Sequence, residues 1–207
     1  MTTIKSKIQE YNTTANELFD GADYALLATI EPATDADLQQ LKHLINVELP
    51  NELIQFYKTF GGLENIGNSE SYCFSISEPE KLIKINDYQG SPKIALGLIE
   101  MIQYSWSFDR WEFDEGENFT KEEINQLNAN YKCIGWYRDD TISETAYYIF
   151  FDQHGNFGEL YYDQDTFYKT FEALKKLLAN DFEKTTLESI LIKALEQTKN
   201  TMIEWNE

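Results

Sequence analysis

The chain has 207 residues, of which 42% are hydrophobic and 14% aromatic, a composition typical of a globular protein that buries a large core. Lys and Arg number 17 against 36 Asp and Glu, which gives a formal net charge of -19 at pH 7. A surplus of this size opposes approach to phosphate backbones and anionic bilayers. The composition therefore excludes nucleic acid and membrane as expected partners and favours cationic ones.

The cysteines and the first residues bear on the cellular compartment. Cys73 and Cys133 lie far apart in sequence, which is typical of reduced thiols in a cytoplasmic protein rather than of a disulfide framework. The segment MTTIKSKIQEYNTTANELFD lacks the apolar core of a signal peptide, and no run approaches the ~18 apolar residues of a membrane helix. We therefore expect a cytoplasmic protein.

Residues 1–50 predict two helices with an extended segment between them. Apolar side chains recur at loosely helical spacing in residues 4–19, and we expect ADYALLATIEP to be extended. In EPATDADLQQLKHLINVELP, Thr34 is suited to cap a helix with an apolar stripe of leucines and isoleucine. This helix is expected to end near Asn46.

The segment LPNELIQFYKTFGGLEN, residues 49–65, combines features of a capped helix and of a glycine loop. Pro50 suits the first turn of a helix, and Gly61 or Gly62 supplies the positive φ that ends one. A phosphate-binding loop would need its glycines before a helix, followed by Lys and Ser or Thr. Here the pair follows the apolar face and leads to Glu64, so we interpret it as a helix terminus.

Beyond residue 70 the pattern favours short strands. YCFSIS, KLIKIND and KIALGLIEMIQYSW carry short apolar runs between turns, and we expect each to be β-like. An acidic loop then leads to a helix in TKEEINQLNANY, capped by Thr120. KCIGWYRDD and TAYYIFFDQHGNFGELYYDQD predict three strands, the last two joined by a turn at DQHGN. DTFYKTFEALKKLLAND and residues 184–199 predict two final helices.

This order of elements predicts an α+β fold, a single domain with N-terminal helices, a central antiparallel β-meander and C-terminal helices. We divide it into three parts. Residues 1–30 form an N-terminal extension that packs on the domain, residues 31–180 form the α+β domain itself, and residues 181–207 form a C-terminal helical extension.

Four segments carry a family resemblance: ATDADLQQLKHLI, VELPNELIQFYKTFGG, YYIFFDQHGNFGELYYDQD and TFYKTFEALKKLL. Through them residues 31–180 resemble the SUKH superfamily, whose founding members are fungal cell-wall-assembly regulators and whose many bacterial members are immunity proteins. Gly61 and Gly62 take the place of the family's small or Asn-Gly pair, and Asp152 and Gly155 that of its hairpin turn. The resemblance implies a compact domain that binds other proteins, and it transfers no catalytic residue.

The residue types that carry catalysis or bind metals do not form a recognisable motif. The two cysteines, His43 and His154 show neither paired zinc spacing nor a signature of Cys–His catalysis. FDEGEN and RDDTISE lack the pattern of a calcium loop. A catalytic carboxylate pair of the glycosidase type stays an open alternative, because such a pair is recognised by the distance between its carboxyl groups in space and not by their spacing in the sequence. We predict no catalytic residue, no cofactor and no metal.

Acidic and aromatic side chains gather in residues 109–123 and 139–165, and the second range holds seven acids and no Lys or Arg. Aromatic anchors ringed by carboxylates are features of a hot spot for a basic protein. The alternative places the Trp side chains in the core and the acids on a solvated face. The predicted partner-binding residues are Trp106, Asp109, Trp111, Glu112, Asp114, Glu115, Glu117, Trp136, Asp139, Asp140, Glu144, Asp163 and Asp165.

These features favour a non-enzymatic immunity protein that binds and neutralises a cognate toxin through an acidic, aromatic surface. The toxin is expected to be basic, and a nuclease fits because its own surface must attract phosphate. The alternative is an intracellular protein-interaction scaffold or regulator of the cell-wall-assembly-regulator type. An enzyme acting on a cationic or sugar substrate is the third hypothesis.

Overall fold

The computed structural model describes residues 1–20, 26–66, 74–85, 95–106, 118–138, 145–163, 167–204 and 206. In these ranges six strands form one sheet in chain order, and each neighbouring pair is antiparallel. The predicted α+β fold built on an antiparallel meander is therefore confirmed. Its elements are α1 (Thr2–Leu18), β1 (Leu27–Thr29), α2 (Asp35–Ile45), α3 (Asn51–Phe60), β2 (Leu63–Asn65), β3 (Phe74–Ile76), α4 (Pro79–Ile85), α5 (Leu98–Trp106), α6 (Lys121–Asn130), β4 (Tyr131–Tyr137), β5 (Thr145–Asp152), β6 (Phe157–Asp163), α7 (Phe167–Leu178) and α8 (Leu187–Glu204).

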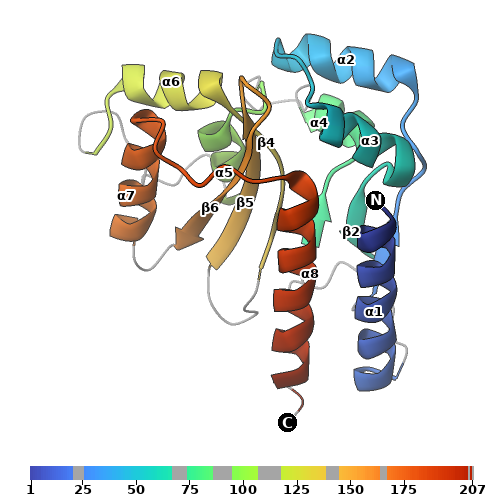
Figure 1. The fold of residues 1–207 in the computed structure, drawn as a ribbon. Helices are drawn as coiled ribbons and strands as arrows, with labels where there is room; N and C mark the ends of the chain where they lie inside the picture. The colour runs from blue at the N-terminus through green and yellow to red at the C-terminus, as the bar shows by residue number, and fades with distance from the viewer. Residues whose placement is uncertain are drawn as a thin grey trace.

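The helices surround the sheet in three groups (Figure 1). Helices α5, α6 and α7 lie beside β4, β5 and β6, whereas α2, α3 and α4 lie at the other end of the molecule. Helices α1 and α8 pack side by side, run in the same direction and project past the sheet. None of the helices in the described ranges is long and apolar enough to cross a bilayer.

The first and last helices are joined by an apolar seam and by ion pairs. On α1 the buried side chains are Ile4, Ile8, Tyr11 and Ala15, four positions that recur every three or four residues. Lys7 Nζ lies 3.0 Å from a Glu196 carboxylate oxygen, and Lys199 Nζ lies 3.8 Å from one of Glu10. The division of the chain at residues 30 and 180 stays a prediction, but the two ends of the chain are packed on each other.

The predicted N-cap of α2 and the glycine end of α3 are confirmed, whereas Pro50 precedes the first turn of α3 as its N-cap residue. The Thr34 side chain accepts a hydrogen bond from the Asp37 N–H, and the Asp37 carboxylate accepts one from the Thr34 N–H, so the two form a capping box. The helix ends at Asn46, which has a φ of 53°. Gly61 ends α3 with a φ of 67°, and a Cβ there would lie 2.0 Å from the Glu31 carbonyl oxygen. The glycine pair is a helix terminus.

The prediction that KLIKIND and KIALGLIEMIQYSW are β-like is wrong. The two segments contribute to the helices α4 and α5. The apolar run of α5 is buried on all sides near its start, which hides the helical period. Its first turn is fixed from a distance, since Asn128 Oδ1 on α6 accepts hydrogen bonds from the N–H groups of Ile99 and Glu100. Strand β2 was not predicted, whereas β3 to β6 were.

One edge of the sheet is covered by a side chain. β1 is an edge strand, and its backbone at Leu27 points away from β2. The Asn12 amide donates a hydrogen bond to the Leu27 carbonyl oxygen and accepts one from the Leu27 N–H, each at 2.9 Å. The amide thus occupies the place that a neighbouring strand would take.

Candidate functional site

The structure describes Trp136 and Asp163 among the predicted partner-binding residues, together with the backbone of Trp106 at the end of α5. Trp136 lies in β4 and Asp163 ends β6, so the intervening β5 separates them in the sheet. The remaining predicted residues lie outside the described ranges: Asp109, Trp111, Glu112, Asp114, Glu115, Glu117, Asp139, Asp140, Glu144 and Asp165.

Trp136 lines a cavity of about 500 Å³ between β3, β4, α4 and α5. The side chain is half-buried, and Tyr104 on α5, which lines the same cavity, is 37% exposed. β3 and β4 lie unusually close here, because a Cβ on Gly135 would come within 2.2 Å of the Ser75 carbonyl oxygen. The cavity, named the Trp136 cavity below, is lined by Ser75, Ser77, Lys81, Lys84, Ile85, Met101, Tyr104, Ser105, Gly135 and Trp136.

Two undescribed stretches of the chain begin a few residues after side chains that line this cavity. Ser105, at the end of α5, lines it, and residue 107 begins the first undescribed stretch. Trp136 lines it from β4, and residue 139 begins the second. The described acids of the two predicted clusters lie elsewhere: Glu122 and Glu123 on α6, and Asp152, Glu159 and Asp163 on β5 and β6.

Lys81 and Lys84 line the Trp136 cavity, and each forms an ion pair with a carboxylate. Lys81 Nζ lies 2.7 Å from a Glu64 oxygen, and Lys84 Nζ lies 2.6 Å from a Glu80 oxygen. The pKa of Glu78 is raised, first by partial burial and then by the negative charges of Glu80 and Glu64. Among the described residues, the lining of the cavity holds these two lysines and no Asp or Glu.

The indole ring of Trp136 is in contact with the guanidinium of Arg138. The Arg138 guanidinium carbon lies 5.4 Å from the centroid of the Trp136 ring. This is the range of a cation–π contact, for which Trp is the strongest aromatic partner. The exposed part of the ring is therefore chemically suited to basic side chains.

Asp163 contributes little surface, because it is only 8% exposed. Its N–H donates a hydrogen bond to Thr170 Oγ1 at 3.2 Å, and its carboxylate accepts one from the Tyr161 hydroxyl at 3.4 Å. The contact with Thr170 joins the end of β6 to α7. The position of Asp163 is thus structural in the free protein.

A second cavity, of about 300 Å³, was not predicted from the sequence. Tyr147 pairs with Tyr137 on one side and with Tyr161 on the other, and the ring centroids lie 4.9 and 5.1 Å apart. The turn at DQHGN fixes this register, so the pairing of Tyr147 with Tyr161 was readable from the hairpin. The cavity, named the Tyr161 cavity, is lined by Tyr147, Glu159, Tyr161, Phe182, Glu183, Thr185, Ser189, Ile190 and Lys193.

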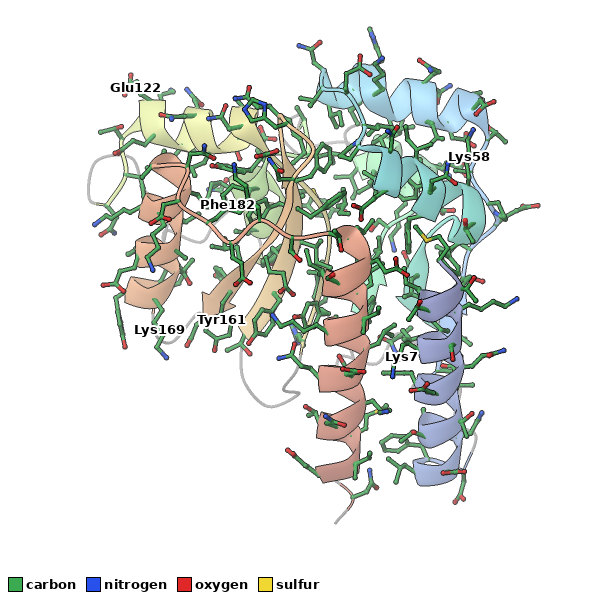
Figure 2. The ribbon with its side chains drawn as sticks, in the orientation of Figure 1. Lys7, Lys58, Glu122, Tyr161, Lys169 and Phe182 are labelled. Carbon is green, nitrogen blue, oxygen red and sulfur yellow. The ribbon has the colours of Figure 1, made fainter. Side chains whose placement is uncertain are left out.

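The two cavities lie on opposite faces of the sheet, because successive residues of a strand point to opposite sides and Trp136 precedes Tyr137. Figure 2 shows Tyr161 on β6 and Phe182 on the segment that joins α7 to α8. Hydrogen bonds join Glu159 to Tyr137 and Lys193 beside these tyrosines. Glu159 accepts a hydrogen bond from the buried Tyr137 hydroxyl at 2.5 Å and one from Lys193 Nζ at 2.6 Å.

The thiol and imidazole groups in the described ranges are not arranged for catalysis. Cys133 is fully buried, and burial raises the pKa of its thiol to about 12. His43 on α2 and His154 in the hairpin turn are both exposed. Cys73 lies outside the described residues. In the same ranges no three His, Cys, Asp or Glu side chains gather as a metal site.

The fold defines the protein as an α+β protein with an antiparallel meander and an aromatic cavity on each face of the sheet. No protein-family model matches the chain, and no curated protein matches it. The relation to the SUKH superfamily stays a resemblance of the four sequence segments.

Proposed function

We propose that this protein is a non-enzymatic immunity protein of the SUKH type, which neutralises a cognate basic toxin by binding it at the Trp136 cavity. The observation that supports this most is the pair of partly exposed aromatic side chains, Trp136 and Tyr104, at one cavity of a chain whose net charge is -19.

The physical roles of these features are complementary. A half-buried indole beside a hollow supplies apolar area with little loss of side-chain entropy, which is why Trp and Tyr dominate hot spots. The net charge of -19 attracts a basic surface and raises the association rate. A nuclease exposes lysines and arginines where it binds phosphate, so an acidic protein can occupy that surface.

The test uses the toxin encoded by a neighbouring reading frame and measures binding by surface plasmon resonance. We expect a tight complex whose association rate falls steeply between about 50 and about 200 mM salt, as steered encounters do. Trp136→Ala should weaken binding by roughly 30-fold or more, the size of a hot-spot loss of about 2 kcal/mol. Tyr104→Ala should weaken it in the same direction.

The matched control is Tyr168→Ala, which removes a 61% exposed tyrosine on α7, outside the cavity. It should bind the toxin as the unmodified protein does. Unchanged binding by both cavity variants would move the interface elsewhere. An association rate independent of salt would remove the electrostatic part, and the absence of any complex would contradict the whole proposal.

A further inference from the structure

We propose that the Tyr161 cavity binds an arginine side chain of a protein partner, with the guanidinium against the tyrosine rings and paired to Glu183, while Glu159 stays paired to Lys193. This inference goes beyond the proposed function, because it concerns the other face of the sheet. It can be tested without a toxin.

The size of the cavity suits a single side chain. Its volume of about 300 Å³ is at the lower end of the range of ligand sites, which spans roughly 300–1,000 Å³. It lies at the outer edge of the sheet, where β6 meets the segment that joins α7 to α8, so a partner can reach it from solvent. Tyr147 and Tyr161 are both partly exposed.

The carboxylates of the cavity differ in how firmly they are held. The Glu159 side chain is only 15% exposed, and the Tyr137 hydroxyl and Lys193 ammonium fix its two oxygens. Glu183 is exposed and, within the described part of the chain, makes no ion pair. A rigid inner carboxylate and an available outer one therefore face the same space.

Lys193 shows that the cavity stabilises a cation. Its Nζ lies 2.6 Å from a Glu159 oxygen and 5.5 Å from the centroid of the Tyr147 ring. An ammonium held between a carboxylate and an aromatic face is the arrangement that a partner's cation would need. The Lys193 side chain is 48% exposed, so it covers this inner position only in part.

Arginine fits the remaining space better than lysine or a sugar. A guanidinium is planar, stacks on aromatic rings and donates paired hydrogen bonds to a carboxylate. It can lie on the tyrosine rings and reach Glu183 while Lys193 keeps its place. A lysine would compete with Lys193 for the same oxygen, and a neutral sugar would gain nothing from the net charge of -19.

The experiment titrates N-acetyl-arginine methylamide into the full chain and follows the ring signals of Tyr147 and Tyr161 by NMR. We expect saturable shifts with a dissociation constant on the order of 1 mM, as one small ligand gives. The citrulline analogue, which has the same shape and no charge, should bind at least about 10-fold more weakly. Methyl glucoside should leave the signals unchanged.

Glu183→Gln should weaken arginine binding by roughly 10-fold, because it removes the outer carboxylate without touching the core. The matched control is Glu172→Gln, an exposed glutamate on α7 outside the cavity, which should change nothing. Lys193→Met should tighten binding by about 3- to 10-fold, because Glu159 then loses its resident cation. A purely structural role of Lys193 would not produce that gain.

Equal binding of the citrulline analogue, or no effect of Glu183→Gln, would overturn the inference. Shifts from methyl glucoside would assign the cavity to sugars instead. These measurements use no toxin, so their failure leaves the proposed function standing, and failure of toxin binding leaves this site untouched.

Discussion

The two edges of the sheet are protected in different ways. β1 has three residues, and a single amide, that of Asn12, satisfies the outward backbone of Leu27. β6 has seven residues, and it is covered at its ends, where Thr185 exchanges backbone hydrogen bonds with Phe157 and Thr170 contacts Asp163. Between these ends the edge opens onto the Tyr161 cavity.

Both edge strands border a cavity, of about 500 Å³ at β1 and about 300 Å³ at β6. The chemistry of the two differs, because carboxylates and tyrosines line the cavity at β6, whereas no carboxylate of the described residues lines the one at β1.

Substitution of the glycine beside each edge strand should give the largest difference. Gly61→Ala places a Cβ 2.0 Å from the Glu31 carbonyl oxygen, next to β1, and keeps a φ of 67°. We expect a loss of about 3 kcal/mol or more in the free energy of unfolding, from backbone strain and displacement of the chain. Urea unfolding followed by circular dichroism measures it.

Gly155→Ala in the β5–β6 turn is the matched control. Its φ is 80°, but an added Cβ would meet only Pro50, at 3.6 Å. Gly155→Ala should lower the free energy of unfolding by about 1 kcal/mol, which is the cost of a positive φ at alanine without a steric clash. Equal losses for the two variants would show that the close approach at Gly61 contributes nothing.

Asn12→Ala should open the β1 edge. It leaves the N–H and C=O of the 3% exposed Leu27 without the hydrogen bonds they now make to Asn12, which should cost about 2 kcal/mol. An unpaired edge also invites pairing with a second chain, so light scattering should show association at high concentration. Thr13→Ala changes an exposed residue on the same helix and controls for helix propensity. It should neither destabilise the protein nor cause association. A monomeric Asn12→Ala variant of normal stability would contradict the role of the amide.

How far the sequence predicts these features depends on the range of the deciding contacts. The caps at Thr34 and Thr120 and the hairpin turn at Gly155 were predicted, because each is decided within a few residues. Helix α5 was not, because its first turn depends on Asn128, 29 residues beyond Ile99. Local pattern has no access to such a contact.

The same limit applies to the candidate sites. Trp136 and Tyr104 were both noted in the sequence as aromatic residues beside the acidic stretches, but their meeting at one cavity depends on how α5 packs on β4. The Tyr161 cavity needs both the hairpin register and the placement of α8, which brings Lys193 over Tyr147. Only the register was readable from the sequence.

Thr170→Val should test the β6 edge and should have a smaller effect than Asn12→Ala. Thr170 is fully buried, and its hydroxyl accepts a hydrogen bond from the Asp163 N–H and donates a long one, 3.4 Å, to the Tyr161 carbonyl oxygen. We expect a loss of about 1 kcal/mol, since the shape is kept and one good hydrogen bond is removed. Thr170→Ser keeps the hydroxyl and should preserve the slow hydrogen exchange of the Asp163 amide. Faster exchange in the serine variant would assign the protection to packing instead.

The smallest change in the free energy of unfolding, and one of opposite sign, is expected for a substitution in the interior, Tyr57→Phe. Within the described part of the chain, the Tyr57 hydroxyl, fully buried on α3, has no hydrogen-bond partner. Burial raises the pKa of this phenol, so it stays neutral. Tyr57→Phe should leave the free energy of unfolding unchanged or raise it by up to about 1 kcal/mol, because an unsatisfied buried hydroxyl is costly.

Tyr137→Phe is the matched control, since the buried Tyr137 hydroxyl donates to the Glu159 carboxylate. It should lose about 1.5 kcal/mol or more, the size of a hydrogen bond to a charged group. Thermal unfolding of the two variants side by side decides the matter. If Tyr57→Phe destabilises as much as Tyr137→Phe, the Tyr57 hydroxyl has a partner, and the contrast between the two buried hydroxyls fails.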